Sequence, residues 1–82
     1  MSGEAHTGAA RWLKARGWLY QPLEDRWVKA DRPETRMSGL IVDEMTNLYG
    51  LVGFTRIVVA VEAGKSAWTS AEARAVAEGR AP

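Results

Sequence analysis

The sequence predicts a small α+β domain, in which a mainly antiparallel sheet of three strands carries one helix on one face and two short helices beside it. Three patterns indicate this fold. Aromatic residues alternate with others around residues 17–30, which is typical of a β-hairpin. A β-branched run over residues 54–63 is typical of a strand, and helical spacing of apolar residues lies between the two.

Chain length and composition indicate one globular domain. The chain has 82 residues, of which 46% are apolar and 26% charged, a composition that favours a folded core over disorder. Residues 1–6 show no periodicity, and we expect them to form a disordered tail. The domain is therefore predicted to span residues 7–82.

The first predicted helix covers residues 8–16. Thr7 is placed to cap it, and Ala9, Trp12 and Leu13 fall on one face. Gly17 suits a left-handed stop.

A β-hairpin is predicted over residues 17–30. Trp18 and Tyr20 point to one side of the first strand, and residues 22–25 have the composition of a turn. Trp27, on the second strand, is expected to face Trp18 or Tyr20, because cross-strand aromatic pairs stabilise hairpins.

Residues 31–50 admit two interpretations. Asp31 and Glu34 resemble a capping pair, with Pro33 in the first turn, and Gly50 suits a helix end. Helical spacing then connects Met37, Leu40, Ile41, Met45 and Leu48. The alternative places a short strand over residues 40–42, so residues 40–48 are either helix or strand; the helix is favoured.

The β-branched run predicts a strand over residues 54–63. Its apolar residues are almost continuous, which favours a strand covered on both faces, with Val59 buried at its centre. Farther on, Thr69 and Glu72 have capping-box spacing and predict a surface helix that runs to Glu78 and stops at Gly79.

Few residues have the chemistry of a catalytic or metal site. The chain has no cysteine and one histidine, His6, so we expect no disulfide, no metal site and no cofactor. Residues 63–66 resemble the end of a phosphate-binding loop, but Val59 stands where that pattern needs a glycine. We therefore predict that the protein is not an enzyme.

The apolar segments and the small size of the chain indicate where the protein is located and whether it self-associates. No secretory signal is visible, and the longest apolar run, residues 57–61, is far shorter than the ~20 residues that span a bilayer. We expect a cytoplasmic protein without membrane contact. A small core that lacks disulfide or metal support also predicts a homo-oligomer.

The abundance of tryptophan indicates a binding function. Four tryptophans are unusual in so short a chain, and this residue type is enriched at interfaces, although the rings can equally form the core. We predict a small protein-binding module, an accessory regulator or inhibitor of the phage or mobile-element type, which docks on a larger protein. Its predicted partner-binding residues lie on the hairpin: Trp18, Tyr20, Arg26, Trp27 and Lys29.

The alternative function is nucleic-acid binding. Arg11, Lys14 and Arg16 form a basic group on the first helix, directly before the hairpin. This order resembles, locally, the helix and wing of winged-helix DNA-binding proteins, and the resemblance implies a small nucleic-acid-binding regulator. The pattern departs from that family because only seven residues precede this helix, too few for the supporting helices. A net charge of +1 adds no general attraction to nucleic acid.

Overall fold

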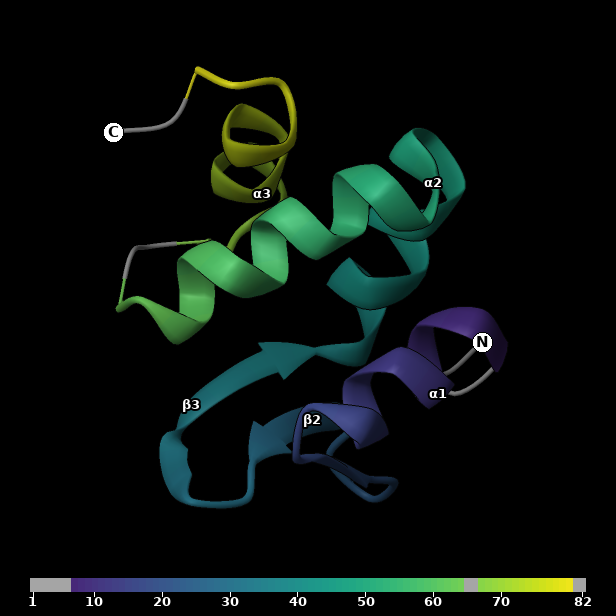
Figure 1. Cartoon of the computed structure of the whole chain (residues 1–82), viewed down its shortest axis with the longest axis vertical. Coiled ribbons are helices and arrows are strands. Elements are labelled where there is room, and N and C mark those ends of the chain that lie inside the picture. Colours follow the sequence, from purple (N-terminus) through teal and green to yellow (C-terminus); the bar gives the residue numbers. More distant parts are fainter. Residues whose placement is uncertain (1–6, 65–66, 81–82) are drawn as a thin grey trace.

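The computed structural model describes residues 7–64 and 67–80, and it confirms the α+β class. A three-stranded antiparallel sheet in the order β1-β2-β3 carries a long helix, and two shorter helices complete the fold (Figure 1). The elements are, in chain order, α1 (Thr7–Ala15), β1 (Trp18–Gln21), β2 (Arg26–Lys29), β3 (Arg32–Ser38), α2 (Gly39–Glu62) and α3 (Ser70–Ala77).

Helix α2 lies in the middle of the molecule. The sheet and α1 pack below it in the view of Figure 1, and α3 packs on its opposite side. The core forms where α2 meets the sheet and α1. Its largest fully buried side chains are Leu13, Trp18, Trp27, Met37, Met45 and Phe54, with Val42, Ile57 and Val58 beside them.

The predicted hairpin is confirmed. Gly17 precedes it with a φ of 87°, and the turn over residues 22–25 is closed by an Asp25 N–H that donates to the Pro22 carbonyl at 3.3 Å. Tyr20 lies opposite Trp27, with ring centroids 5.2 Å apart. Of the two partners predicted for Trp27, which were Trp18 and Tyr20, the folded chain therefore uses Tyr20.

The third strand is not where the sequence placed it. The prediction of a strand over residues 54–63 is wrong, because these residues form the second half of α2. Ile57, Val58 and Val61 are buried, and their spacing of one and three residues places them on one face of a helix. The same β-branched residues also suit a strand. β-Propensity is weak enough for tertiary packing to override it.

The strand that completes the sheet is β3, which begins at Arg32 and so takes up most of the predicted helix start at residues 31–34. Pro33 has no N–H to give to a ladder, but β3 lies at the sheet edge, where proline is tolerated. The capping interpretation of Asp31 and Glu34 is therefore wrong, and the helix begins only at Gly39.

Helix α2 confirms the helical interpretation of residues 40–48. Ser38 is its N-cap, and its side-chain oxygen accepts a hydrogen bond from the Leu40 N–H at 3.1 Å. Gly50 does not end the helix; with a φ of 69° and a ψ of −175°, it bends the chain between two helical segments. This backbone conformation is almost exclusive to glycine.

The exposed side of α2 includes Val59. Its side chain is 52% exposed, whereas the adjacent Val58 is fully buried. The expectation that Val59 is a central core residue is therefore wrong, because the helical period of 3.6 turns neighbours about 100° apart.

The predicted last helix is confirmed as α3. Thr69 and Glu72 form the complete capping box, and Gly79 follows the helix with a φ of 77°. Ala73 and Ala77 are buried against α2, so the alanines provide the packing face of this short surface helix.

Some predictions fall on residues outside the described ranges. They are the tail over residues 1–6, which includes His6, and the Lys65-Ser66 half of the tetrapeptide that resembles a phosphate-binding loop. A helix precedes this tetrapeptide, whereas that motif requires a strand. Among residues 7–64 and 67–80, no helix is both long and apolar enough to cross a membrane.

Candidate functional site

The hairpin tryptophans belong to the core. Trp18 and Trp27 are both 0% exposed, so neither presents a surface to a partner in this fold. Tyr20 is half-buried on Trp27, and its hydroxyl donates to the Asp25 carboxylate. These two rings therefore belong to the core of this fold, and the partner-binding role expected of the hairpin residues stays a prediction.

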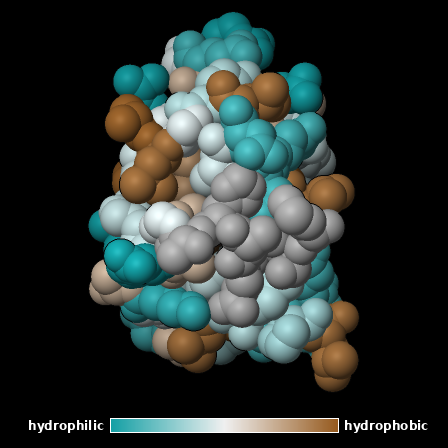
Figure 2. All heavy atoms as spheres, turned by 90° about the vertical axis from the view of Figure 1, so that its right-hand side faces the viewer, coloured by the Kyte–Doolittle hydropathy of each residue, from teal (hydrophilic) through white to brown (hydrophobic). Residues whose placement is uncertain are grey.

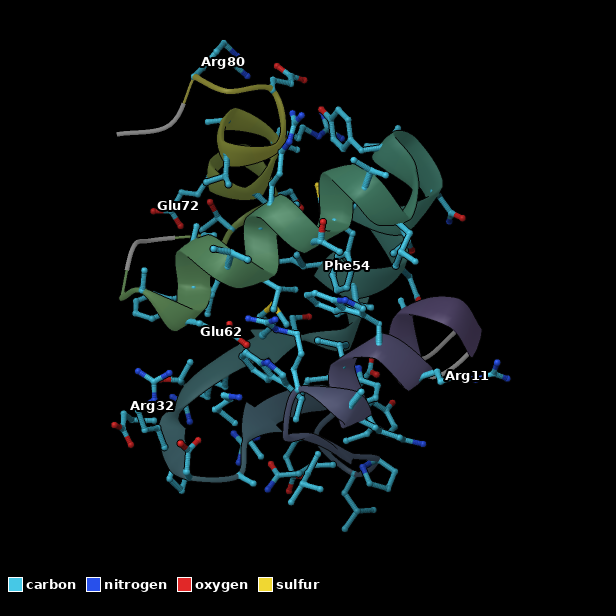
Figure 3. The ribbon with its side chains drawn as sticks, viewed as in Figure 1. Arg11, Arg32, Phe54, Glu62, Glu72 and Arg80 are labelled. Atoms are coloured by element: carbon cyan, nitrogen blue, oxygen red, sulfur yellow. The ribbon has the colours of Figure 1, made fainter. Side chains whose placement is uncertain are left out.

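Several of the predicted site residues meet instead at one carboxylate. Glu62, at the end of α2, accepts a hydrogen bond from Trp18 Nε1 at 2.8 Å and another from Arg16 Nε at 3.2 Å. Lys29 Nζ lies 3.8 Å from the same carboxylate. Figure 3 shows Glu62 directed from α2 toward the hairpin. These four residues, here called the Glu62 cluster, join α2 to β1, to β2 and to Arg16, which directly follows α1.

The charges of the Glu62 cluster stabilise one another. The hydrogen bond from Arg16, together with that from Trp18 and the nearby Lys29, lowers the pKa of Glu62, against the opposing effect of its burial. The same contact raises the pKa of Arg16. Arg16 also lies over the Trp12 ring, 4.9 Å from its centroid. Arg16 and Lys29 are therefore engaged within the fold.

The basic group on α1 is divided by these contacts. Arg11 points outward from α1 (Figure 3), and Lys14 is also exposed, whereas Arg16 is bound to Glu62. The three cations that the sequence grouped together thus do not form one free positive surface.

A surface cleft lies at the other end of the sheet. It has a volume of about 510 Å³ and gathers side chains from the hairpin turn, from β3 and from the loop before α3. Trp68 contributes a half-exposed ring, 56% accessible to solvent. We call it the Trp68 cleft; it is lined by Glu24, Asp25, Arg26, Glu34, Arg36, Met37, Ser38 and Trp68.

Local contacts hold the two walls of the Trp68 cleft. On one wall, the Gly39 N–H donates to the Asp25 carbonyl at 2.7 Å, which ties the hairpin turn to the end of β3. On the other, the Trp68 N–H donates to the Glu72 carboxylate at 3.2 Å, next to the capping box. Ala67 is fully buried and anchors the loop beside Trp68. The fold thus presents Trp68 from a fixed backbone.

The sequence predicted only one residue of this cleft, Arg26. Trp68, Arg36 and Glu34 were missed, because a cleft between a hairpin turn and a loop some forty residues later depends on tertiary packing. One signal was present: Trp68 directly precedes the capping box of a surface helix and belongs to no apolar pattern.

A second hollow, of about 450 Å³, lies where α2 meets α3. It is lined by Leu40, Asp43, Glu44, Asn47 and Ser70. Glu44 accepts hydrogen bonds from Ser70 at 2.6 Å and from Arg74 at 3.2 Å, and both lower its pKa. These contacts join the two helices, which gives this hollow a structural role.

Apolar side chains are also exposed along α2. Figure 2, which faces the bend of this helix, shows hydrophobic groups separated by polar ones. The exposed apolar residues of α2 are Leu40, Leu48, Leu51, Val52 and Val59. The homo-oligomer expected from the sequence stays a prediction.

Comparison of the chain with protein-family models, with curated proteins and with solved structures finds no match.

Proposed function

We propose that this protein is a small protein-binding module that docks on a larger protein through the Trp68 cleft, as an accessory regulator or inhibitor. The observation that carries the proposal is the half-exposed Trp68 ring within a cleft of about 510 Å³. Tryptophan and arginine are the residue types most enriched at binding hot spots, and Arg26 and Arg36 line the same cleft.

The composition of the cleft supports a protein as its ligand. An apolar centre with a charged rim is the usual anatomy of a protein interface. Trp68 provides apolar surface beside the buried Met37, and both charge signs surround it. Such a lining can pair with the mixed side chains of a polypeptide.

Nucleic acid is a less suitable ligand for this cleft. Three carboxylates line it against two guanidinium groups, and phosphate would be repelled by the excess of acid. On the alternative nucleic-acid surface at α1, Arg16 is already bound to Glu62, which removes one cation from contact with phosphate. Binding to a polyanion needs several cations that are free to contact phosphate.

The test is affinity capture from the native host, followed by measurement of affinity for the purified partner. We expect Trp68→Ala to weaken binding by at least about 2 kcal/mol, the usual threshold of a hot spot, without changing the melting temperature by more than a few degrees. The matched control is Leu19→Ala, because Leu19 is also 56% exposed but lies on β1, the strand farthest from β3.

The result that would overturn the proposal is equal loss of affinity in both variants, or none in Trp68→Ala. A salt titration against random duplex DNA distinguishes the alternative. Binding that weakens steeply with salt and depends on Arg11 and Lys14 would favour nucleic acid instead.

A further inference from the structure

The free edge of the sheet borders the Trp68 cleft. β3 pairs with β2 on one side only, and among the described residues no strand lies on its other side. Residues of β3 that line the cleft are Glu34, Arg36, Met37 and Ser38. An unpaired strand edge is a template for another extended chain.

The hydrogen-bond pattern shows which backbone groups of β3 are available. In an antiparallel ladder, bonded and non-bonded residue pairs alternate. The bond from the Gly39 N–H to the Asp25 carbonyl sets the phase, so Trp27 and Met37 form the next bonded pair. Arg36 and Ser38, which lie between bonded positions, turn their N–H groups away from β2, toward the free edge.

The available edge is short. Ser38 is the N-cap of α2, so its carbonyl accepts the first bond of that helix, which leaves the Ser38 N–H and both backbone groups of Arg36. Among the described residues, no backbone hydrogen bond outside the helices and strands involves these three groups. Pro33 interrupts the edge at the start of β3 because it has no N–H. The edge therefore offers about three backbone bonds, at its cleft end.

The two faces of this edge differ in chemistry. Met37 points to the core face, which α2 covers, and Trp68 lines the cleft beside Met37. Arg36 points to the opposite, outer face. The register places two rows of residues there: Leu19, Val28 and Arg36, then Gln21, Arg26 and Ser38. These rows include Arg26 and Arg36, whereas the three acids that line the cleft, Glu24, Asp25 and Glu34, lie outside them.

From this geometry we propose that the ligand of the Trp68 cleft is an extended segment of the partner protein, which adds to β3 as a fourth, antiparallel or parallel strand. Its side chains alternate between apolar residues, which contact the exposed Trp68 ring, and acidic residues, which lie beside Arg36 on the outer face. Opposite charges on neighbouring strands attract, and side-chain alternation gives such strand addition its specificity. The inference rests on the proposed function and specifies its ligand.

The probe for the test is a phage-displayed library of random dodecapeptides, selected on the full chain. We expect enriched peptides to alternate acidic and apolar residues. Arg36→Pro removes the edge N–H but leaves the Trp27–Met37 bonds intact, and Arg36→Ala removes only the side chain. We therefore expect Arg36→Pro to bind the selected peptide on the order of tenfold more weakly than Arg36→Ala. N-methylation of the peptide at alternate amides should cause a comparable loss.

The outcomes separate the two proposals. If Trp68→Ala abolishes peptide binding while Arg36→Pro and the N-methylated peptide bind like their controls, the cleft is retained as the docking site and strand addition is overturned. If Trp68→Ala binds normally, both proposals fail. If no peptide is enriched, or if sedimentation shows a dimer of the chain that Arg36→Pro dissociates and Arg36→Ala does not, the peptide ligand is overturned. The melting temperature of Arg36→Pro, measured in parallel, must stay near that of Arg36→Ala.

Discussion

The indole Nε1 of Trp18 donates a hydrogen bond of 2.8 Å to the carboxylate of Glu62, across 44 positions of the sequence. Trp18 begins the sheet and Glu62 ends the long helix, so this bond joins the two halves of the fold. Arg32 strengthens the same junction, since its guanidinium donates to the Glu62 carbonyl at 3.2 Å. A fully buried indole N–H is thereby satisfied by a charged acceptor.

The Glu62 cluster predicts an acid-sensitive contribution to stability. Its hydrogen bonds, that from Arg16 first, lower the pKa of Glu62 in the folded chain. The contribution is therefore present above the unfolded pKa of about 4.3 and lost as the pH falls through the folded pKa. Between neutral pH and about pH 3, we expect wild type to lose more free energy of unfolding than Glu62→Gln. Urea titrations at several pH values measure this; parallel curves for the two proteins would contradict it.

Two buried tryptophans predict unequal responses to the same substitution. Trp18 Nε1 bonds to Glu62, whereas Trp27 Nε1 finds no acceptor among the described residues. Trp18→Phe therefore loses packing and a charged hydrogen bond, and Trp27→Phe loses packing alone. We expect Trp18→Phe to cost about 1.5–3 kcal/mol more than Trp27→Phe. Chemical denaturation provides the comparison, and equal costs would show that the bond to Glu62 adds no net stability.

Two adjacent valines on α2 are expected to differ in how well the fold tolerates a charged side chain in their place. Val58 is 0% exposed and Val59 is 52% exposed. An aspartate at position 58 would be buried without a partner, which costs several kcal/mol, so Val58→Asp should not fold cooperatively. Val59→Asp should change stability by no more than about 0.5 kcal/mol. Circular dichroism melts decide this, and an unfolded Val59→Asp would argue for a strand over residues 54–63.

Replacing either of two helical glycines, Gly50 or Gly8, by alanine is expected to change the stability of the protein, with opposite signs. Gly50 has a φ of 69°, and a Cβ there would meet no atom within 4 Å, so Gly50→Ala reports backbone strain without a clash. We expect it to destabilise the protein by about 1–3 kcal/mol. Gly8, in α1, is equally open but has no positive φ.

Gly8→Ala is the matched control for this bend. Alanine is favoured over glycine inside a helix, so we expect a gain of up to about 1 kcal/mol. Thermal melts of the two variants measure whether each one is more or less stable than the wild type. Stabilisation by Gly50→Ala would mean that α2 runs straight through this position.

The sequence by itself determined the elements that depend on local chemistry. Gly17 and the turn over residues 22–25 define the first helix end and the hairpin, because their conformational preferences act within a few residues. Thr69 and Glu72 define the start of α3 in the same way, since a capping box is complete within one helical turn. Alternation also limited the aromatic partner of Trp27 to Trp18 or Tyr20, and the folded sheet pairs it with Tyr20.

Only the tertiary structure decided which apolar segment became helix, and which residues form the candidate site. The β-branched residues 54–63 satisfy both a strand and a helical face, and burial against the sheet and α3 selected the helix. The same packing buries Trp18 and Trp27 in the core and leaves Trp68 at the surface. Composition identifies tryptophan as a candidate for either place, whereas the choice depends on neighbours that are distant in sequence and are brought close only by folding.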